Sequence, residues 1–154
     1  MKLKIAVLPG DGIGPEVTNQ SIKVLKCISD KYNHNIELSE GRVGAIAIDE
    51  YNDPYPDITH KLCMESDAIL FGAIGDPKYD NDPKAKVRPE QGLLKMRKKL
   101  GLFANLRPTI IFESLLDMSP IKEERIKDTN ILFVRELTGG IYFGERGRKD
   151  NDNY

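Results

Sequence analysis

Residues 4–15, Lys4-Ile5-Ala6-Val7-Leu8-Pro9-Gly10-Asp11-Gly12-Ile13-Gly14-Pro15, contain the pattern that decides the fold. They begin with a short apolar run rich in strand formers, which a proline and three glycines then stop. Pro15 suits the first turn of a helix, and apolar residues at helical spacing follow it, at Val17, Val24, Leu25 and Ile28. The stretch therefore predicts a strand, a glycine-rich loop and a helix.

The glycine-rich loop, residues 10–15, has two interpretations. Backbone N–H groups at a strand-to-helix turn, beside a helix N-terminus, suit an anionic ligand. The loop does not have the G-x-G-x-x-G spacing of dinucleotide-binding folds, because Pro15 and Glu16 interrupt it. A tight turn that needs positive φ explains the same glycines without a ligand. These residues alone leave both interpretations open.

The rest of the chain alternates between strand and helix patterns. Expected strands are 35–39, 68–73 and 131–135, and an extended segment is expected at 103–111. Asp57 is expected to cap a short helix that carries Ile58, Leu62 and Met64. The run 68–73 is almost wholly apolar, as in a strand covered on both faces of a parallel sheet. This alternation predicts an α/β fold.

Composition excludes several classes of partner. The 154 residues contain 23 Lys and Arg against 24 Asp and Glu, and no block of like charge, which argues against nucleic acid or an anionic membrane as a partner. The longest apolar runs, 5–8 and 68–73, are too short to span a bilayer, and Pro9 interrupts any signal-type segment. We expect a cytoplasmic protein with small-molecule or protein partners.

The cysteines and histidines do not suggest a site. Cys27 and Cys63 lie far apart without a CxxC motif, so we expect two reduced, packed thiols rather than a disulfide or a metal site. His34 and His60 lie in polar settings, where we expect neither to have a partner, so neither is a good candidate for a catalytic base.

The segment 90–97 predicts a helix with an unusual face. Positions i, i+3, i+4 and i+7 combine a carboxylate, two isobutyl groups and a guanidinium: Glu90, Leu93, Leu94 and Arg97. This face suits a small molecule with one apolar and one anionic end, and Arg107 in the next extended segment would add a second cation. The alternative is an ordinary core stripe of Leu93, Leu94, Met96 and Leu100 with solvated charges at its margins.

Three further features have a functional and a structural interpretation. The proline-rich loop 75–89 is long for a compact domain, and such loops are more often functional than idle. Arg135 ends an apolar strand, so it either faces a solvent-filled cleft and an anion or pairs with Glu136. Tyr142 has a phenol that can donate a proton, although a tyrosine flanked by apolar residues is more often part of a core.

Taken together, these motifs resemble the isocitrate/isopropylmalate dehydrogenase family, and within it the 3-isopropylmalate dehydrogenases. The matching segments run in order through nearly the whole chain, at 10–16, 72–75, 88–90, 93–94, 103–108 and 134–145. Asp76 departs from the pattern, because many members have a second glycine there. The resemblance implies the two-domain α/β fold of that family, with residues 1–100 in the first domain and 101–154 beginning the second.

The resemblance also implies how substrate binds. Arg97, Arg107 and Arg135 would hold the malate carboxylates of 3-isopropylmalate, while Leu93 and Leu94 would cradle its isopropyl group. Related isocitrate dehydrogenases have a polar residue in place of Leu93, because their substrate carries a third carboxylate there. Isopropylmalate is therefore favoured over isocitrate, whereas tartrate or another alkylmalate stays an alternative.

For the cofactor, the resemblance implies an NAD site that includes Ile13, Gly75, Pro77, Lys78, Tyr79, Asp80 and Glu90. The implied reaction, in leucine biosynthesis, oxidises the 2-hydroxyl by hydride transfer and then expels CO2, with Tyr142 as the catalytic proton donor. The family works as a homodimer with Mg²⁺ or Mn²⁺. Its catalytic lysine and metal-binding aspartates follow the segment that matches 141–145, so we expect no metal ligands in this chain.

The end of the sequence, residues 146–154, is polar and lacks a closing apolar element, so we expect an N-terminal portion of a longer enzyme. We expect the 154-residue chain alone to be inactive and to fold marginally, with exposed apolar edges. A noncatalytic ligand-binding module that kept the substrate pocket is the alternative. The sequence does not decide which alkylmalate or which divalent metal is preferred, or whether the truncation is natural.

Overall fold

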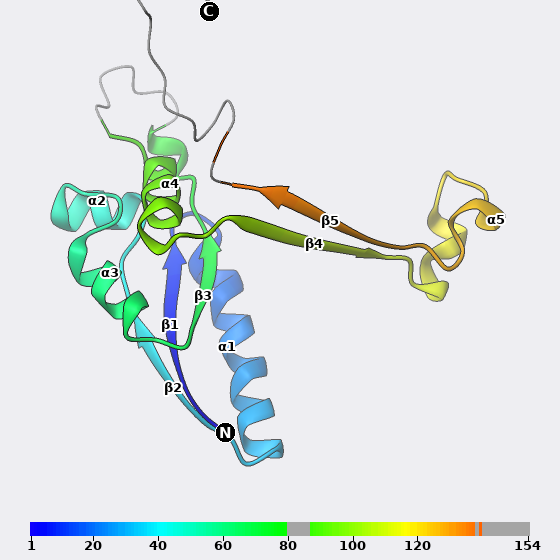
Figure 1. Cartoon of the computed structure of the whole chain (residues 1–154), viewed down its shortest axis with the longest axis horizontal. Helices are drawn as coiled ribbons and strands as arrows, with labels where there is room; N and C mark the ends of the chain where they lie inside the picture. Colours follow the sequence, from blue (N-terminus) through cyan, green and yellow to red (C-terminus); the bar gives the residue numbers. More distant parts are fainter. Residues whose placement is uncertain (80–86, 138, 140–154) are drawn as a thin grey trace, which may run out of the picture. The chain divides into compact units, whose positions relative to one another are not determined.

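The computed structural model describes residues 1–79, 87–137 and 139. The chain forms two compact units, Met1–Gly101 and Leu102–Tyr154. The first unit contains, in chain order, β1 (Lys2–Gly10), α1 (Gly14–Lys31), β2 (Asn35–Glu40), α2 (Ala45–Tyr51), α3 (Asp57–Met64), β3 (Ala68–Ala73), the 3-10 turn η1 (Pro77–Tyr79) and α4 (Pro89–Leu100), as Figure 1 shows. The predicted α/β class is confirmed.

The first unit is built on a parallel sheet in the order β2-β1-β3. Helix α1 connects β1 to β2, and α2 and α3 connect β2 to β3. Alternate residues of β1 point to opposite faces of the sheet. Ala6 and Leu8 are buried in a core with Cys63 of α3 and Met96 of α4. Val7 lies on the other face of the sheet, toward Ile22 and Leu25 of α1. The sheet is thus covered by α1 on one face and by α3 and α4 on the other.

The strand-loop-helix prediction for the N-terminus is confirmed. Gly10 has a φ of 77° and Gly12 a φ of 56°, and Pro15 lies in the first turn of α1. A Cβ on Gly10 would come within 1.9 Å of the Ala73 carbonyl oxygen at the end of β3. The tight-turn interpretation therefore accounts for Gly10 through close packing of backbone against backbone.

Several local expectations are wrong. Pro56, not Asp57, is the N-cap of α3, and Asp57 is the first helical residue. Strand β3 is half-buried rather than buried, because it lies at the edge of the sheet that the described strands form. Cys27 is exposed on α1, although Cys63 is buried and both thiols are free. Each histidine has a partner: His60 Nδ1 lies 3.2 Å from the Tyr55 hydroxyl, and His34 Nδ1 lies 3.4 Å from the amino terminus.

The second unit is an antiparallel pair, β4 (Ala104–Ile110) and β5 (Asn130–Glu136), whose register runs from Ala104 opposite Glu136 to Ile110 opposite Asn130. The connection between them contains a 3-10 helix, η2 (Glu113–Met118), and a short α5 (Glu123–Ile126). Every residue of β5 is exposed. The extended segments expected at 103–111 and 131–135 are confirmed, whereas α2 and η2 were not expected.

No helix in the described part of the chain is long and apolar enough to cross a membrane.

Candidate functional site

Those sequence-predicted cofactor residues that the structure describes gather near the carboxyl ends of β1 and β3. Because β1 lies between β2 and β3, the connections that follow β1 and β2 cover opposite faces of the sheet (Figure 1). The loops that follow β1 and β3 then meet at the point where the winding direction reverses. In open parallel sheets, ligands bind in the crevice at such a point. This edge of the sheet is therefore the candidate site.

Asp11 holds the parts of this edge together. Its carboxylate accepts hydrogen bonds from the Ala45 N–H at the start of α2 and from the Gly75 N–H after β3, each at 2.6 Å. Its backbone N–H donates to the Ala73 carbonyl at 2.9 Å. The residue is only 7% exposed, so these are charge-assisted bonds in a largely dry environment. Asp11 thus joins the glycine loop, α2 and the loop after β3.

Ile13, Gly75 and Glu90 lie around this junction. Ile13 is the N-cap of α1, and its side chain is 57% exposed. A Cβ on Gly12 would lie 3.2 Å from the Gly75 carbonyl oxygen, and a Cβ on Gly75 would lie 3.9 Å from Glu90 Oε1. Gly75 has a φ of 145°, a conformation that L side chains rarely adopt. The structure therefore brings together the glycine loop, Gly75 and the first turn of α4.

The segment after Gly75 is fixed to α2. Asp76 Oδ1 accepts the Lys78 backbone N–H at 3.0 Å, which closes the turn that begins at Pro77. Asp49 of α2 accepts hydrogen bonds from Lys78 Nζ at 2.5 Å and from the Tyr79 hydroxyl at 3.0 Å. The Lys78 ammonium, and then the Tyr79 hydroxyl, hold the pKa of the Asp49 carboxyl below its usual range. Both predicted cofactor side chains thus point to α2.

Helix α4 divides its predicted face between the core and the surface. Leu93 is half-buried and packs against the core with Leu100, next to the buried Met96. Leu94 is 39% exposed, and Glu90, one turn before it, is also exposed. Arg97 is half-buried. The core-stripe interpretation therefore explains Leu93, Met96 and Leu100, but it does not explain Leu94.

The orientation of α4 is set by contacts on its other side. Lys95 Nζ bonds to Asp53 at 2.5 Å and Lys99 Nζ bonds to Asp57 at 2.6 Å, so two turns of α4 are tied to the segment that begins α3. The helix begins with Arg88 as its N-cap, whose N–H donates to Gln91 Oε1 at 3.2 Å. These contacts leave Glu90 and Leu94 on the exposed side.

In the second unit, Arg107 and Arg135 share one face of the β4–β5 pair. Asn105 lies opposite Arg135 in the register, and Asn105 and Arg107 are two residues apart, so all three side chains leave the same face. Arg107 Nε donates to Asn105 Oδ1 at 3.4 Å. Two guanidiniums at diagonal positions on one face suit an anionic ligand with more than one oxygen. The two other predicted site residues, Asp80 and Tyr142, lie outside the described residues.

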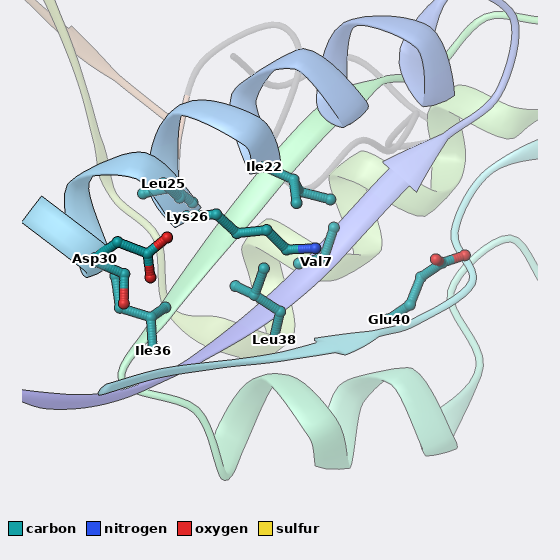
Figure 2. Close-up of a pocket in the computed structure, with 9 residues that line it drawn as sticks. Val7, Ile22, Leu25, Lys26, Asp30, Ile36, Leu38 and Glu40 are labelled. Atoms are coloured by element: carbon teal, nitrogen blue, oxygen red, sulfur yellow. The ribbon is translucent and has the colours of Figure 1, made fainter. Parts of the chain in front are cut away.

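A separate cavity lies between α1 and β2, away from these residues. It has a volume of about 520 Å³, and apolar residues such as Leu38 line it together with the charged Lys26, Asp30 and Glu40, as Figure 2 shows. None of the sequence-predicted site residues lines it. The cavity therefore does not belong to the candidate site.

Comparison with known proteins identifies the family. The model of the isocitrate/isopropylmalate dehydrogenase family matches residues 4–153. The chain belongs to this family. A 3-isopropylmalate dehydrogenase from Bacteroides fragilis (strain YCH46) is 53% identical over 152 residues, which are 99% of this chain and 43% of that protein. The 3-isopropylmalate dehydrogenase of Bacillus subtilis (strain 168) is 52% identical over 97% of this chain and 40% of its own length.

Solved structures agree with this assignment. A β-decarboxylating dehydrogenase from Thermococcus kodakarensis in its apo form matches with a TM-score of 0.65 and 32% identity, over 94% of this chain and 36% of that one. An isocitrate dehydrogenase from Methylococcus capsulatus matches with a TM-score of 0.67 and 27% identity, over 92% of this chain and 36% of that one. The fold is thus that of the family, and the chain spans about two fifths of the length of the curated relatives that it matches.

The structure gives a structural role to three carboxylates that the sequence analysis did not predict as site residues: Asp11, Asp49 and Asp76. Each binds backbone or side-chain donors of the loops around Gly75. Asp76 was noted only as a departure from the family pattern, and its position before a proline was the available signal for a turn. Asp11 and Asp49 act across the fold, so no local pattern predicts their partners. In the described ranges, no three His, Cys, Asp or Glu gather closely enough to hold a metal ion.

Proposed function

We propose that the protein which contains this chain is an NAD-dependent dehydrogenase that oxidises and decarboxylates 3-isopropylmalate to 4-methyl-2-oxopentanoate in leucine biosynthesis. The observation that carries this proposal is the identity of 52–53%, over nearly the whole chain, to proteins named 3-isopropylmalate dehydrogenase. Because the chain spans only about two fifths of those proteins, the activity is proposed for the protein over its complete reading frame.

The proposed substrate contacts combine cations with apolar surface. Arg97, Arg107 and Arg135 bind the two carboxylates, and Leu94 with Leu93 accommodates the isopropyl group. The exposure of Leu94 beside Glu90 supports this role, since a purely structural stripe would bury it. Placing the third carboxylate of isocitrate against these leucines without a partner would cost on the order of several kcal/mol. The branched alkyl substrate is therefore preferred.

The proposed cofactor site is the junction of the loops after β1 and β3. A nicotinamide ribose fits this junction, because the approach to Gly75 is open, Ile13 is exposed and the Glu90 carboxylate lies nearby. The adjoining segment of the proposed site consists of Pro77, Lys78, Tyr79 and Asp80. NAD, when bound, supplies the hydride acceptor. The residues of this chain bind and orient the reactants, and Tyr142 is proposed as the group that protonates the enol at carbon.

The remaining parts of the proposal follow the family resemblance. We assign residues 1–100 to the first domain and 101–154 to the beginning of the second, in a cytoplasmic homodimer. The described residues do not offer a ligand set for Mg²⁺ or Mn²⁺, so no step through the metal is derived from them. The 154-residue chain alone is proposed to be inactive, since the family's catalytic lysine and metal carboxylates follow the segment that matches 141–145.

The test is a spectrophotometric assay of NADH formation with the protein from the complete reading frame, Mg²⁺ and 3-isopropylmalate, isocitrate or tartrate in turn. We expect the highest kcat/KM with 3-isopropylmalate, and no turnover by the 154-residue chain. A higher kcat/KM with tartrate or another alkylmalate would assign a different member of the superfamily. Calorimetric binding of 3-isopropylmalate without turnover by the complete protein would instead support a noncatalytic binding module.

A further inference from the structure

Helix α2 is linked to both ends of the segment 75–79. At the start of the segment, one Asp11 carboxylate accepts the N–H groups of Gly75 and of Ala45, the first residue of α2, each at 2.6 Å. At the end of the segment, Asp49 of α2 accepts hydrogen bonds from the side chains of Lys78 and Tyr79. The segment is therefore attached to one short helix at two points.

The two carboxylates lie in different environments. Asp11 is 7% exposed and binds backbone groups that the fold itself depends on. The side chain of Asp49 is 53% exposed, and that of Lys78 is 48% exposed. Exposed ion pairs contribute little to global stability, so we expect the fold to stay intact when the Asp49 carboxylate is lost. This loss would release the side chains of Lys78 and Tyr79 from α2, while Asp76 still closes the turn that begins at Pro77.

We propose that Asp49 is a positioning residue that fixes the segment 75–79 in the conformation that receives the nicotinamide nucleotide. The inference rests on the proposed function and extends it from the residues that meet the cofactor to the residue that holds them. Its physical basis is preorganisation: a segment already held in its binding conformation does not pay for ordering when the ligand arrives. The Lys78 and Tyr79 side chains, which bond to Asp49, are the means of attachment.

The test uses D49N in the protein from the complete reading frame, with E65Q as the matched control. Asp49→Asn removes the charge at nearly constant size. Glu65 forms an ion pair with Lys61 on α3, 3.8 Å apart and similarly exposed, with no bond to the segment. We expect D49N to raise the KM for NAD and the dissociation constant of NADH about 2- to 5-fold, as for loss of exposed bonds. We expect an unchanged kcat and an unchanged KM for 3-isopropylmalate.

Two further measurements separate positioning from a general structural role. Exchange of the backbone amide hydrogens of Lys78 and Tyr79 in the free protein should become faster in D49N and stay unchanged in E65Q. D49E keeps the negative charge and should bring the KM for NAD back toward the original value. Y79F removes only the hydroxyl bond and should give part of the D49N effect.

The failures are distinguishable. If the unmutated protein does not reduce NAD with 3-isopropylmalate, the proposed function is wrong. If it does, but D49N and E65Q have the same KM for NAD and the same exchange rates, the positioning role is wrong. A fall in kcat with an unchanged KM for NAD would also overturn it, because a positioning residue for cofactor binding acts on affinity.

Discussion

Asp11→Ala tests whether one carboxylate organises the candidate site. The substitution removes the acceptor of two backbone N–H groups, those of Ala45 and Gly75, while the backbone of the loop stays the same. Leaving a buried donor without its acceptor lowers the free energy of unfolding by about 1–3 kcal/mol, and the loss is at the upper end of this range when the acceptor was charged. Ala45 is 1% exposed, so its N–H cannot turn to water, whereas Gly75 is exposed and its N–H can. We therefore expect a loss of about 3 kcal/mol from the free energy of unfolding.

The measurement is urea unfolding of the protein from the complete reading frame, monitored by far-UV circular dichroism. Amide exchange reports on the first unit residue by residue. Asp57→Ala is the control, because the Asp57 side chain is highly exposed and bonds to the Lys99 side chain rather than to a buried backbone group; we expect a much smaller loss of stability there than in D11A. The amides of Ala45 and Gly75 should exchange faster in D11A than in D57A. Equal losses of stability in the two variants, or unchanged exchange at Ala45, would refute this reasoning.

Three other predictions concern single residues and the isolated chain. Leu94→Glu should lower kcat/KM for 3-isopropylmalate at least about 100-fold with little change in unfolding midpoint, since an unpaired carboxylate beside an apolar group costs several kcal/mol; an unchanged kcat/KM would exclude Leu94 from the pocket. Carboxyl NMR should show the pKa of Asp49 below the ordinary aspartate value of 3.8, because Lys78 and Tyr79 bind the charged form. The bonds to Asp49 therefore stabilise the fold at pH values above the pKa of the unfolded chain, and this contribution is lost as the pH falls through the lower pKa of the folded protein. Lys78→Met should return the pKa of Asp49 toward 3.8. An unchanged pKa in that variant would exclude the bond between Lys78 and Asp49. The isolated 154-residue chain should bind a hydrophobic dye and melt over a broad range, since Leu106, Leu132 and Val134 of the second unit are more than half exposed; a sharp melt without dye binding would contradict marginal folding.

The strands and the two long helices of the first unit were predictable because their signals are local. The run 4–8 is apolar and stops at a proline and glycines, and α1 and α4 each begin beside a proline with an apolar repeat behind it. Helix α2 gave no such signal. Its N-cap is Gly44 with a φ of 78°, and a glycine has no side chain with which to cap the helix. Its start is instead stabilised by Asp11, which lies 34 residues earlier in the sequence.

The residues of the candidate site also divide into those that local sequence patterns predict and those that only the structure reveals. A helical repeat indicated that Glu90, Leu94 and Arg97 share a face, but only the structure shows that Leu93 joins the core while Leu94 stays exposed. Alternation along β4 and β5 follows from sequence, yet the register that puts Arg107 and Arg135 on one face depends on which residues pair. The sequence therefore predicts which side chains an element offers, whereas pairing between distant segments decides which of them meet.

This separation has a consequence for how substrate preference can change in the family. The contacts that fix α4, from Lys95 to Asp53 and from Lys99 to Asp57, lie away from Leu94. The loops around Gly75 depend instead on carboxylates that bind backbone and neighbouring side chains, foremost Asp11. In the proposed site, a substitution at position 94 would thus alter the surface presented to the substrate without disturbing either the helix or the loop at Gly75. Because residue 94 is partly exposed, a polar side chain there costs little stability. In the proposed site, the residue at position 94 can therefore change the preferred substrate while the fold of the first unit stays the same.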